Sequence, residues 1–408
     1  MSATPHRGLP DGLEKVHLDQ ITETMVVNIG PSHPITHGTL RIQLEIDGET
    51  ILRAGAEIGY LHRGYEKQSE NCQYQQVIPY AERMNYCSTI HNSNAWCYAC
   101  EQLLDIEAPP RAQAIRVITS EMARITDHCV CLGANIVDLG ALTNFWYLNN
   151  VREKMLLAFE ELSGARMMTN YPRIGGVCLD VPDGWLEKQH KVMSDIGGLL
   201  GDVRDLLQNN RIFIDRTEGV CPIDLQTALN FGMTGPCLRA CGMPMDLRKD
   251  EPYWGYEKYK FDVPTRQNGD TLDRMMIRID EMDESRKIIQ QAIEQIPSGP
   301  HLLEDHLVVL PPKDSVYNTM EGLINHFKLV MHGIQPPKGE MYSYTEAPNG
   351  ELGFFIVSDG GPKAFRVRVR PPCFANYSAF PQMLKGAAVA DVAAALGSIN
   401  IIAGELDR

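Results

Sequence analysis

The sequence predicts an α+β fold in which a helical body carries small antiparallel sheets near both ends of the chain. Apolar residues recur at helical spacing through residues 112–139, and short strand-like runs joined by turn signals lie near both ends. Helices and strands do not alternate along the chain as a doubly wound parallel sheet would require. With 408 residues, 44% of them hydrophobic, the chain can bury a large core.

The first 60 residues predict a loosely held arm followed by a small sheet. Residues 1–22 are expected to form a flexible arm that precedes a single domain at 23–408. The first region of that domain, the N-terminal β-hairpin region at 23–60, contains strand-like runs at residues 25–29, 39–46 and 50–56. Asp47 and Gly48, between the last two runs, are typical of a hairpin turn.

Residues 61–335 predict a helical body with three well-marked helices. The expected helices cover residues 112–139, 185–207 and 270–296. Pro109 and Pro110 mark the start of the first helix, since proline suits the first turn. Asp270 can cap the last helix, and Pro297 ends it.

Residues 336–408 predict a C-terminal β/α region. The expected elements are a hairpin at 339–357, a strand at 365–369, and short helices at 377–384 and 389–396. Pro348, Asn349 and Gly350 fall where the hairpin must turn, and all three residue types favour turns.

The net charge of −14 argues against a nucleic-acid-binding protein and against docking on anionic lipid by charge alone. No apolar run of the kind a secretory signal needs is present in residues 1–20. The 11 cysteines are therefore interpreted as reduced thiols in a cytoplasmic compartment. The apolar stretch at 387–404 is interrupted by Asp391, Ser398 and Asn400, so it is not expected to span a membrane.

Cysteine and histidine pairs give no metal site by themselves. Cys97 and Cys100 form a C-x-x-C pair, but a zinc site needs further ligands and no second pair is present. Most of the cysteines are therefore expected to be small core residues. His33 and His37 lie in a turn between the first two strands. The pattern alone leaves open whether this turn is a functional site or carries its histidines incidentally.

The helix predicted at 112–139 also carries carboxylates. An unpaired carboxylate is costly in a core, so Asp127 is expected at the surface. Asp138 lies between Val137 and Leu139, which favours burial with a partner. A histidine would suit, because the pair would raise the imidazole pKa and keep the ring a proton donor near neutrality. No glycine-rich phosphate loop is present, so nucleotide binding is not expected.

Ordered motifs from about Met25 to Arg408 carry a family resemblance. These motifs are Gly30-Pro31-x-His33-Pro34-x-Thr36-His37-Gly38, Gly59-Tyr60-Leu61-His62-Arg63-Gly64, Pro109-Pro110-Arg111-Ala112, Gly164-Ala165-Arg166, Arg173-Ile174-Gly175-Gly176-Val177, Lys338-Gly339-Glu340 and Gly404-Glu405-Leu406-Asp407-Arg408. With them the chain resembles the 49-kDa-type subunit of respiratory complex I, the D-type component of bacterial NADH-quinone oxidoreductase. The resemblance implies a subunit that holds the quinone headgroup while the quinone is reduced.

That family shares its fold with the large subunit of nickel–iron hydrogenases, so the resemblance implies a hydrogenase-like fold. Those hydrogenases need four thiolates, two in an early motif and two in a late one, because soft sulfur ligands hold their metals. Asn85 and Ser88 stand at the early cysteine positions of this sequence, and Ile402 and Glu405 stand at the late positions. No bimetallic site is therefore expected, and the resemblance implies that quinone uses the vacated cavity.

The resemblance assigns roles to four residues. Tyr86 matches the tyrosine that hydrogen-bonds a quinone carbonyl, and His37 matches the histidine that faces the headgroup. Asp138 matches the carboxylate paired with that histidine. Arg63 matches an arginine near the terminal tetranuclear iron–sulfur cluster, which a partner subunit holds. No metal or flavin is therefore expected in this chain.

Two positions depart from the family pattern. Asn85 replaces the aspartate that usually precedes the quinone tyrosine, which removes a charge near the headgroup. Met168 stands where many members have a histidine next to the cluster. Neither departure changes Tyr86, His37 or Asp138.

The resemblance also implies partners and a location. The partners would be the B-type iron–sulfur subunit, the C-type subunit, the ferredoxin-like I-type subunit and the A-type and H-type membrane subunits. The assembly would be a proton-translocating NADH-quinone oxidoreductase, with this chain peripheral on the cytoplasmic side of a bacterial inner membrane. Two alternatives stay open: a subunit of a related ferredoxin-driven or hydrogenase-related ion pump, and a non-catalytic scaffold.

Overall fold

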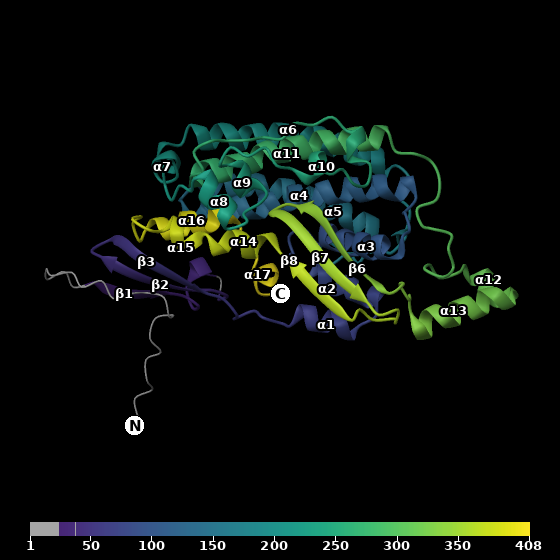
Figure 1. Ribbon diagram of the computed structural model, residues 1–408. Helices are drawn as coiled ribbons and strands as arrows, with labels where there is room; N and C mark the ends of the chain where they lie inside the picture. The colour runs from purple at the N-terminus through teal and green to yellow at the C-terminus, as the bar shows by residue number, and fades with distance from the viewer. Residues whose placement is uncertain (1–23, 37) are drawn as a thin grey trace, which may run out of the picture.

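The structure is a computed structural model that describes residues 24–36 and 38–408. The predicted arm at 1–22 and the candidate residue His37 lie outside the described residues. Figure 1 shows a layer of long helices, with one sheet at an end of the molecule and another against the helices. The α+β prediction is confirmed, and each sheet is antiparallel.

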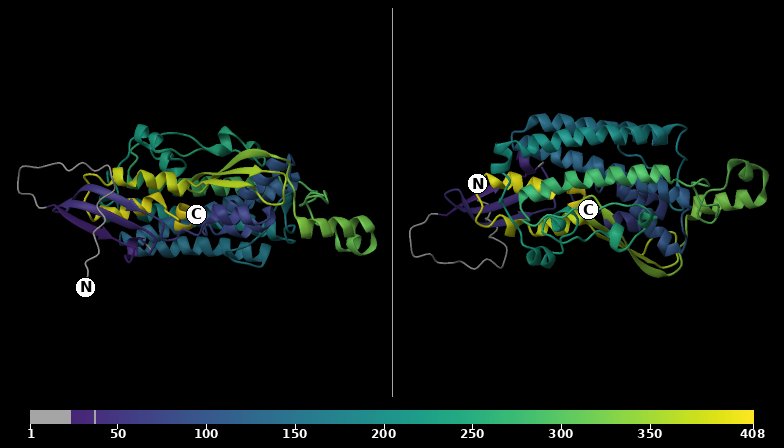
Figure 2. Two further views of the ribbon diagram at one scale, coloured as in Figure 1. Left: turned by 60° about the horizontal axis from the view of Figure 1, so that its bottom comes forward. Right: turned by 90° about the horizontal axis from the view of Figure 1, so that it is seen from above.

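The helical layer is built from long helices that pack side by side (Figures 1 and 2). They are α3 (Thr89–Leu104), α4 (Pro110–Asp138), α5 (Leu142–Ser163), α6 (Trp185–Gln208) and α11 (Thr271–Glu294). The three helices predicted from periodicity are confirmed as α4, α6 and α11. Pro110 occupies the first turn of α4, and the Asp270 carboxylate accepts the N–H of Asp273 at 2.8 Å at the start of α11.

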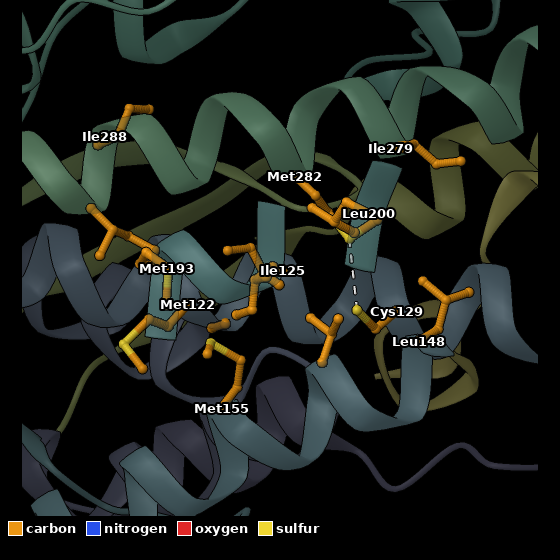
Figure 3. Packing of buried hydrophobic residues seen from close by; sticks show 14 of the residues in the cluster. Met122, Ile125, Cys129, Leu148, Met155, Met193, Leu200, Ile279, Met282 and Ile288 are labelled. Carbon is orange, nitrogen blue, oxygen red and sulfur yellow. Dashed lines mark hydrogen bonds between the residues drawn. The ribbon is translucent and has the colours of Figure 1, made fainter. Parts of the chain in front are cut away.

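The core between these helices is made of long apolar side chains (Figure 3). Met122, Ile125 and Cys129 of α4 are buried together with Met155 of α5 and Met282 of α11. The thiol of Cys129 lies 3.7 Å from the sulfur of Met282. Burying one such aliphatic side chain contributes about 1.5–3 kcal/mol. This shared core fixes α4 as the centre of the helical layer.

The N-terminal sheet has the order β1-β2-β3. Its strands are β1 (Met25–Ile29), β2 (Arg41–Asp47) and β3 (Thr50–Glu57). Asp47 pairs with Thr50 across the predicted turn, where Gly48 has a φ of 60°. Ile42 and Leu44 of β2 are buried in one cluster with residues near the other end of the chain. The two ends of the chain therefore share a core.

The C-terminal sheet has the order β6-β7-β8 and packs against α3. Its strands are β6 (Gly339–Ala347), β7 (Gly350–Ser358) and β8 (Arg366–Arg370), as the sequence predicted within a residue or two. The edge strand β8 is covered by α1 (Tyr65–Asn71). The N–H of Val369 donates to Glu66 at 3.0 Å, and that of Val367 donates to Glu70 at 3.4 Å.

The C-terminal helices begin and end at other residues than predicted. They are α14 (Pro372–Ser378), α15 (Phe380–Met383), α16 (Asp391–Ile399) and α17 (Ala403–Asp407). The helix predicted at 377–384 is divided at Ala379, where α14 ends and α15 begins. Pro372 and Pro381 each lie in a first turn, because proline is tolerated there and not in a helix interior.

Short elements complete the chain. They are η1 (Pro34–Thr36), η2 (Tyr74–Val77), α2 (Ile78–Glu82), β4 (Pro172–Arg173), β5 (Gly176–Val177), α7 (Arg211–Asp215), α8 (Leu225–Asn230), α9 (Pro236–Arg239), α10 (Leu247–Asp250), η3 (Tyr256–Lys258), α12 (Lys313–Asn318) and α13 (Met320–His332). Across the described ranges, no helix combines the length and apolar character that crossing a bilayer requires.

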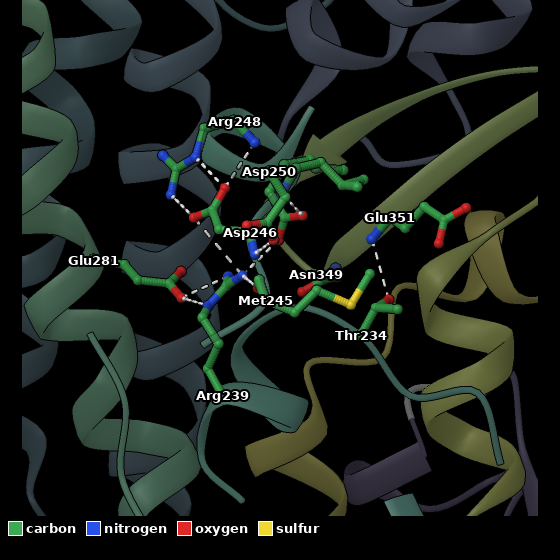
Figure 4. A network of polar contacts seen from close by, with 12 residues as sticks. Thr234, Arg239, Met245, Asp246, Arg248, Asp250, Glu281, Asn349 and Glu351 are labelled. Carbon is green, nitrogen blue, oxygen red and sulfur yellow. Dashed lines mark hydrogen bonds and ion pairs between the residues drawn. The ribbon is translucent and has the colours of Figure 1, made fainter. Parts of the chain in front are cut away.

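A buried ionic network ties the loop-rich middle of the chain to the helices (Figure 4). Arg239 of α9 bonds to Glu281 of α11 at 2.7 Å and to Glu346 of β6 at 2.8 Å. Arg248 of α10 bonds to Asp246 at 2.6 Å and reaches α4 through Glu121 at 3.0 Å. All of these side chains are at most 2% exposed. Each charge is therefore offset by a partner within the core.

Replacing Arg239 by leucine is expected to destabilise the fold by about 3–5 kcal/mol, because Glu281 and Glu346 would lose a buried partner. The matched control is Arg204→Leu. Arg204 pairs with Asp280 and Asp283, but its side chain is 30% exposed, so the expected loss is about 1 kcal/mol or less. Urea unfolding of the purified chains measures both. Equal losses would show that burial of the network adds nothing to its contribution to stability.

Candidate functional site

Two segments far apart in the sequence meet at the candidate site. One is residues 83–88, between α2 and α3, and the other is residues 400–405, which run from the end of α16 into α17. The guanidinium of Arg63 donates to the carbonyl of Arg83 at 2.9 Å and to that of Gly404 at 3.3 Å. A Cβ on Gly404 would lie 2.8 Å from two carbonyl oxygens of the other segment. Glycine therefore permits the close approach.

The carboxylate of Asp127 links the two segments to α4. It accepts the side-chain amide of Asn85 at 2.8 Å and that of Asn400 at 2.6 Å. Asp127 is fully buried, so its predicted surface position is wrong. The prediction failed because the partners of Asp127 come from segments 42 and 273 residues away. These two amide donors supply the hydrogen bonds that a buried carboxylate needs.

The four residues that the sequence analysis matched to hydrogenase cysteines are all buried. Asn85, Ser88, Ile402 and Glu405 are each at most 5% exposed. The side-chain oxygen of Asn85 also accepts the N–H groups of Cys87 and Ser88, which shapes the turn before α3. Residues 83–88 and 400–405, which contain these four positions, therefore lie next to each other.

Tyr86 differs from its neighbours because 47% of its surface is exposed. It borders a small pocket that Arg152, Arg166 and Met167 also line. Partial burial, together with the nearby Cys87 and Asp127, raises the pKa of the Tyr86 phenol. The phenol thus keeps its proton and can donate a hydrogen bond to a molecule arriving from outside.

Two buried carboxyls near this region were not singled out from the sequence as proton-carrying groups. Burial raises the pKa of Glu405 to about 7, although the N–H of Cys373 and the Asn85 side chain act to lower it. Burial likewise raises the pKa of Glu82 to about 7, against the backbone N–H of Asn170. Only tertiary burial distinguishes them from ordinary surface glutamates, so the sequence contains no local signal for these shifts.

The predicted residue Asp138 lies on the same helix as Asp127, at its C-terminal end. It is the last residue of α4, eleven positions after Asp127, which corresponds to about 16 Å along a helix. Asp138 is exposed in this chain, so the predicted burial is wrong. Near it, the side chain of Asn135 donates to the carbonyl of Gly397 in α16. The short helix η1, which precedes His37, packs against α16 as well.

The prediction that most cysteines are core residues is confirmed. Nine of the eleven are buried and all are free thiols, including Cys97 and Cys100 on α3. Within residues 24–36 and 38–408, no three His, Cys, Asp or Glu side chains are placed to share a metal ion. His91 is fully buried, and burial and the nearby Arg124 lower its pKa to about 3. It is therefore neutral across the physiological range.

Comparisons with known proteins agree on one family. Residues 138–408 match the family described as respiratory-chain NADH dehydrogenase, 49 Kd subunit. The chain is 50% identical over 382 residues to the C/D subunit of the NADH-quinone oxidoreductase of Bdellovibrio bacteriovorus, covering 94% of this chain and 68% of the relative. It is 46% identical over 387 residues to the D subunit of the Myxococcus xanthus enzyme, covering 95% and 93% of the two chains. The D subunit of Geobacter sulfurreducens is also 46% identical over 387 residues, covering 95% and 99%.

The two buried carboxyls are expected to titrate near pH 7. The pKa of each carboxyl is raised from its ordinary value of 4.5 to about 7 by folding, so the folded chain binds these protons more tightly than the unfolded chain. Stability should therefore fall as pH rises from 4.5 to about 7. Infrared spectra of the protein should lose protonated-carboxyl absorption over the upper part of this interval. Glu405→Gln and Glu82→Gln should each remove part of that change, whereas Glu187→Gln on the surface should not. An unchanged infrared titration in both variants would contradict the assignment.

Proposed function

We propose that this chain, which belongs to the family of 49-kDa subunits of the respiratory-chain NADH dehydrogenase and is a subunit of an NADH-quinone oxidoreductase, holds the quinone headgroup at Tyr86. The observation that carries the proposal is the half-exposed phenol of Tyr86, which lies between the buried residues Asn85 and Cys87 where two distant segments meet. Its raised pKa keeps the hydroxyl protonated, so it can donate to one quinone carbonyl.

Reduction of a quinone to a quinol consumes two electrons and two protons. We propose that Tyr86 and His37 each donate one proton and that Asp138 positions His37. Two contacts support the pairing, since both η1 and the end of α4 that carries Asp138 pack against α16.

The fixed charge of Arg63 suits a position next to the tetranuclear iron–sulfur cluster of a partner subunit. Arg63 lies in an exposed basic surface on a chain whose net charge is −14. The surface consists of Arg63, Lys67, Arg83, Arg366 and Arg368, grouped around α1. Glu66 and Glu70 of α1 pair with Lys67, Arg366 and Arg368, so five basic residues against two acidic ones leave a basic excess. A surface of this sign favours an acidic partner. A permanent positive charge there would stabilise the reduced, more negative state of a neighbouring cluster.

The hydrogenase-like relation fits the same geometry. The early and late segments meet around Arg63 and Asp127, as a four-thiolate site shared by two motifs would require. We also propose the B-type iron–sulfur subunit as the partner that holds the cluster, with the C-type, I-type, A-type and H-type subunits as further partners. The chain would then be a peripheral subunit on the cytoplasmic side of a bacterial inner membrane, held there by the other subunits.

Tyr86→Leu is expected to leave assembly intact and to reduce quinone reductase activity at least about tenfold, because one hydrogen-bond and proton donor is lost. Electron transfer from NADH to artificial acceptors should persist. Tyr86→Phe removes the hydroxyl but keeps the aromatic ring, and it should reduce quinone reductase activity as much as Tyr86→Leu does. Tyr80→Leu is the control, since Tyr80 is also exposed, by 40%. Wild-type quinone turnover in the Tyr86 variants would favour the scaffold alternative.

The proposed pairing of His37 with Asp138 predicts non-additive losses. Asp138→Asn should lower quinone turnover by weakening His37 as a proton donor, and His37→Ala should lower it further. The double variant is expected to be little worse than the worse single variant, because residues that act as a unit are not additive. Steady-state turnover of the three variants measures this. Losses that simply multiply would show that the residues act independently.

A further inference from the structure

Helices α12 and α13 project from the body as a separate arm. Figures 1 and 2 show the pair at the end of the molecule opposite the N-terminal sheet. Thr319 joins them, and its hydroxyl accepts the N–H of Gly322 at 3.1 Å, which caps α13. A Cβ on Gly322 would lie 2.5 Å from the carbonyl oxygen of Ser315, so glycine lets the two helices pack closely. The arm is therefore an ordered helical hairpin.

One face of α13 is apolar and exposed. The exposed apolar side chains are Met320 (74%), Leu323 (51%), Ile324 (45%), Phe327 (57%), Val330 (53%) and Met331 (60%). At about 100° per residue these positions form a single stripe. The buried residues of the helix, Gly322 and Leu329, lie on the opposite side. The helix thus presents its larger apolar face away from the body.

The arm buries little of the apolar surface of α13. A helix of 13 residues gains little from propensity alone and depends on burial of its apolar face. α13 packs mainly against the short helix α12, which has no buried residue. Soluble monomers seldom expose a contiguous apolar patch of this kind unless it binds something. A partner that covers the stripe would supply the missing burial.

The charges of the arm decide between possible partners. The two helices carry two lysines, Lys313 and Lys328, and two acidic residues, Asp314 and Glu321, beside the histidines His326 and His332. An anionic bilayer attracts helices with a basic excess, which this arm lacks. A second copy of this chain would bring a second net charge of −14 and be repelled. An uncharged apolar protein surface remains as the best complement.

We propose that the apolar stripe of α13 is a docking site for another protein subunit of the same NADH-quinone oxidoreductase. That subunit offers an apolar groove with little charge, into which α13 lies as an amphipathic helix. Phe327 is central in the stripe, so it is the main anchor of the interface. The inference rests on membership of a multi-subunit enzyme and is independent of the quinone assignment of Tyr86.

Hydrogen–deuterium exchange of the assembled complex and of the purified chain tests the proposal directly. In the complex, the amides of α13 should exchange at least about tenfold more slowly than in the free chain. A photo-cross-linker at position 324 should attach to one other subunit. Equal exchange in the two samples, or cross-links to lipid or to a second copy of this chain, would overturn the proposal.

A substitution pair adds an independent measurement. Phe327→Asp should lower incorporation of the chain into the purified complex several-fold, because a charge would be buried in an apolar groove. Lys328→Asp places the same residue on the same helix beside the stripe and should assemble normally. Thermal unfolding of the free variants checks their fold. If Phe327→Asp unfolds the free chain, Phe327→Ser replaces it. Normal incorporation of the folded Phe327 variant would contradict the proposal.

Discussion

The buried carboxylate of Asp127 is the interaction on which the candidate site depends. It stands on α4, which the apolar core fixes at the centre of the helical layer. Because it accepts amide donors from Asn85 and Asn400, two distant segments are attached to one rigid helix. Gly404 lets the backbones approach, and Arg63 joins their carbonyls. At this junction Asn85 and Cys87 are buried, and Tyr86 between them is exposed.

Buried carboxylates and exposed arginines occupy different parts of the molecule. The side-chain amide of Asn85 donates to the carboxylate of Asp127, which contributes to the raised pKa of the Tyr86 phenol. In the rest of the interior, arginines such as Arg239 and Arg248 satisfy the buried acids. Exposed arginines lie instead near α1, where Arg366 and Arg368 pair with Glu70 and Glu66 and Arg63 bonds to the carbonyl of Arg83. An acidic chain can thus present a basic surface at the place where we propose that electrons arrive.

The interior and the arm differ in what holds them together. The N-terminal strands and the C-terminal helices share one apolar cluster, so the two ends of the chain depend on each other. The arm formed by α12 and α13 contributes Leu329 to an apolar cluster of the body but leaves Phe327 and its neighbours exposed. In the complex, a partner subunit would bury the apolar side chains of α13 that folding of the single chain leaves exposed. Stability of the body and docking of the arm are therefore separable properties.

The sequence by itself determined the fold class, the long helices α4, α6 and α11, and both hairpins, because periodicity, caps and turns are local signals. It also identified the family, since Tyr86, Arg63 and the motifs around them are ordered along the chain. Only the tertiary structure decided that Asp127 is buried, that Asp138 is exposed, and that Glu82 and Glu405 hold protons near pH 7. Burial and charge pairing are set by residues that meet from distant segments, and no local pattern records which segments will meet.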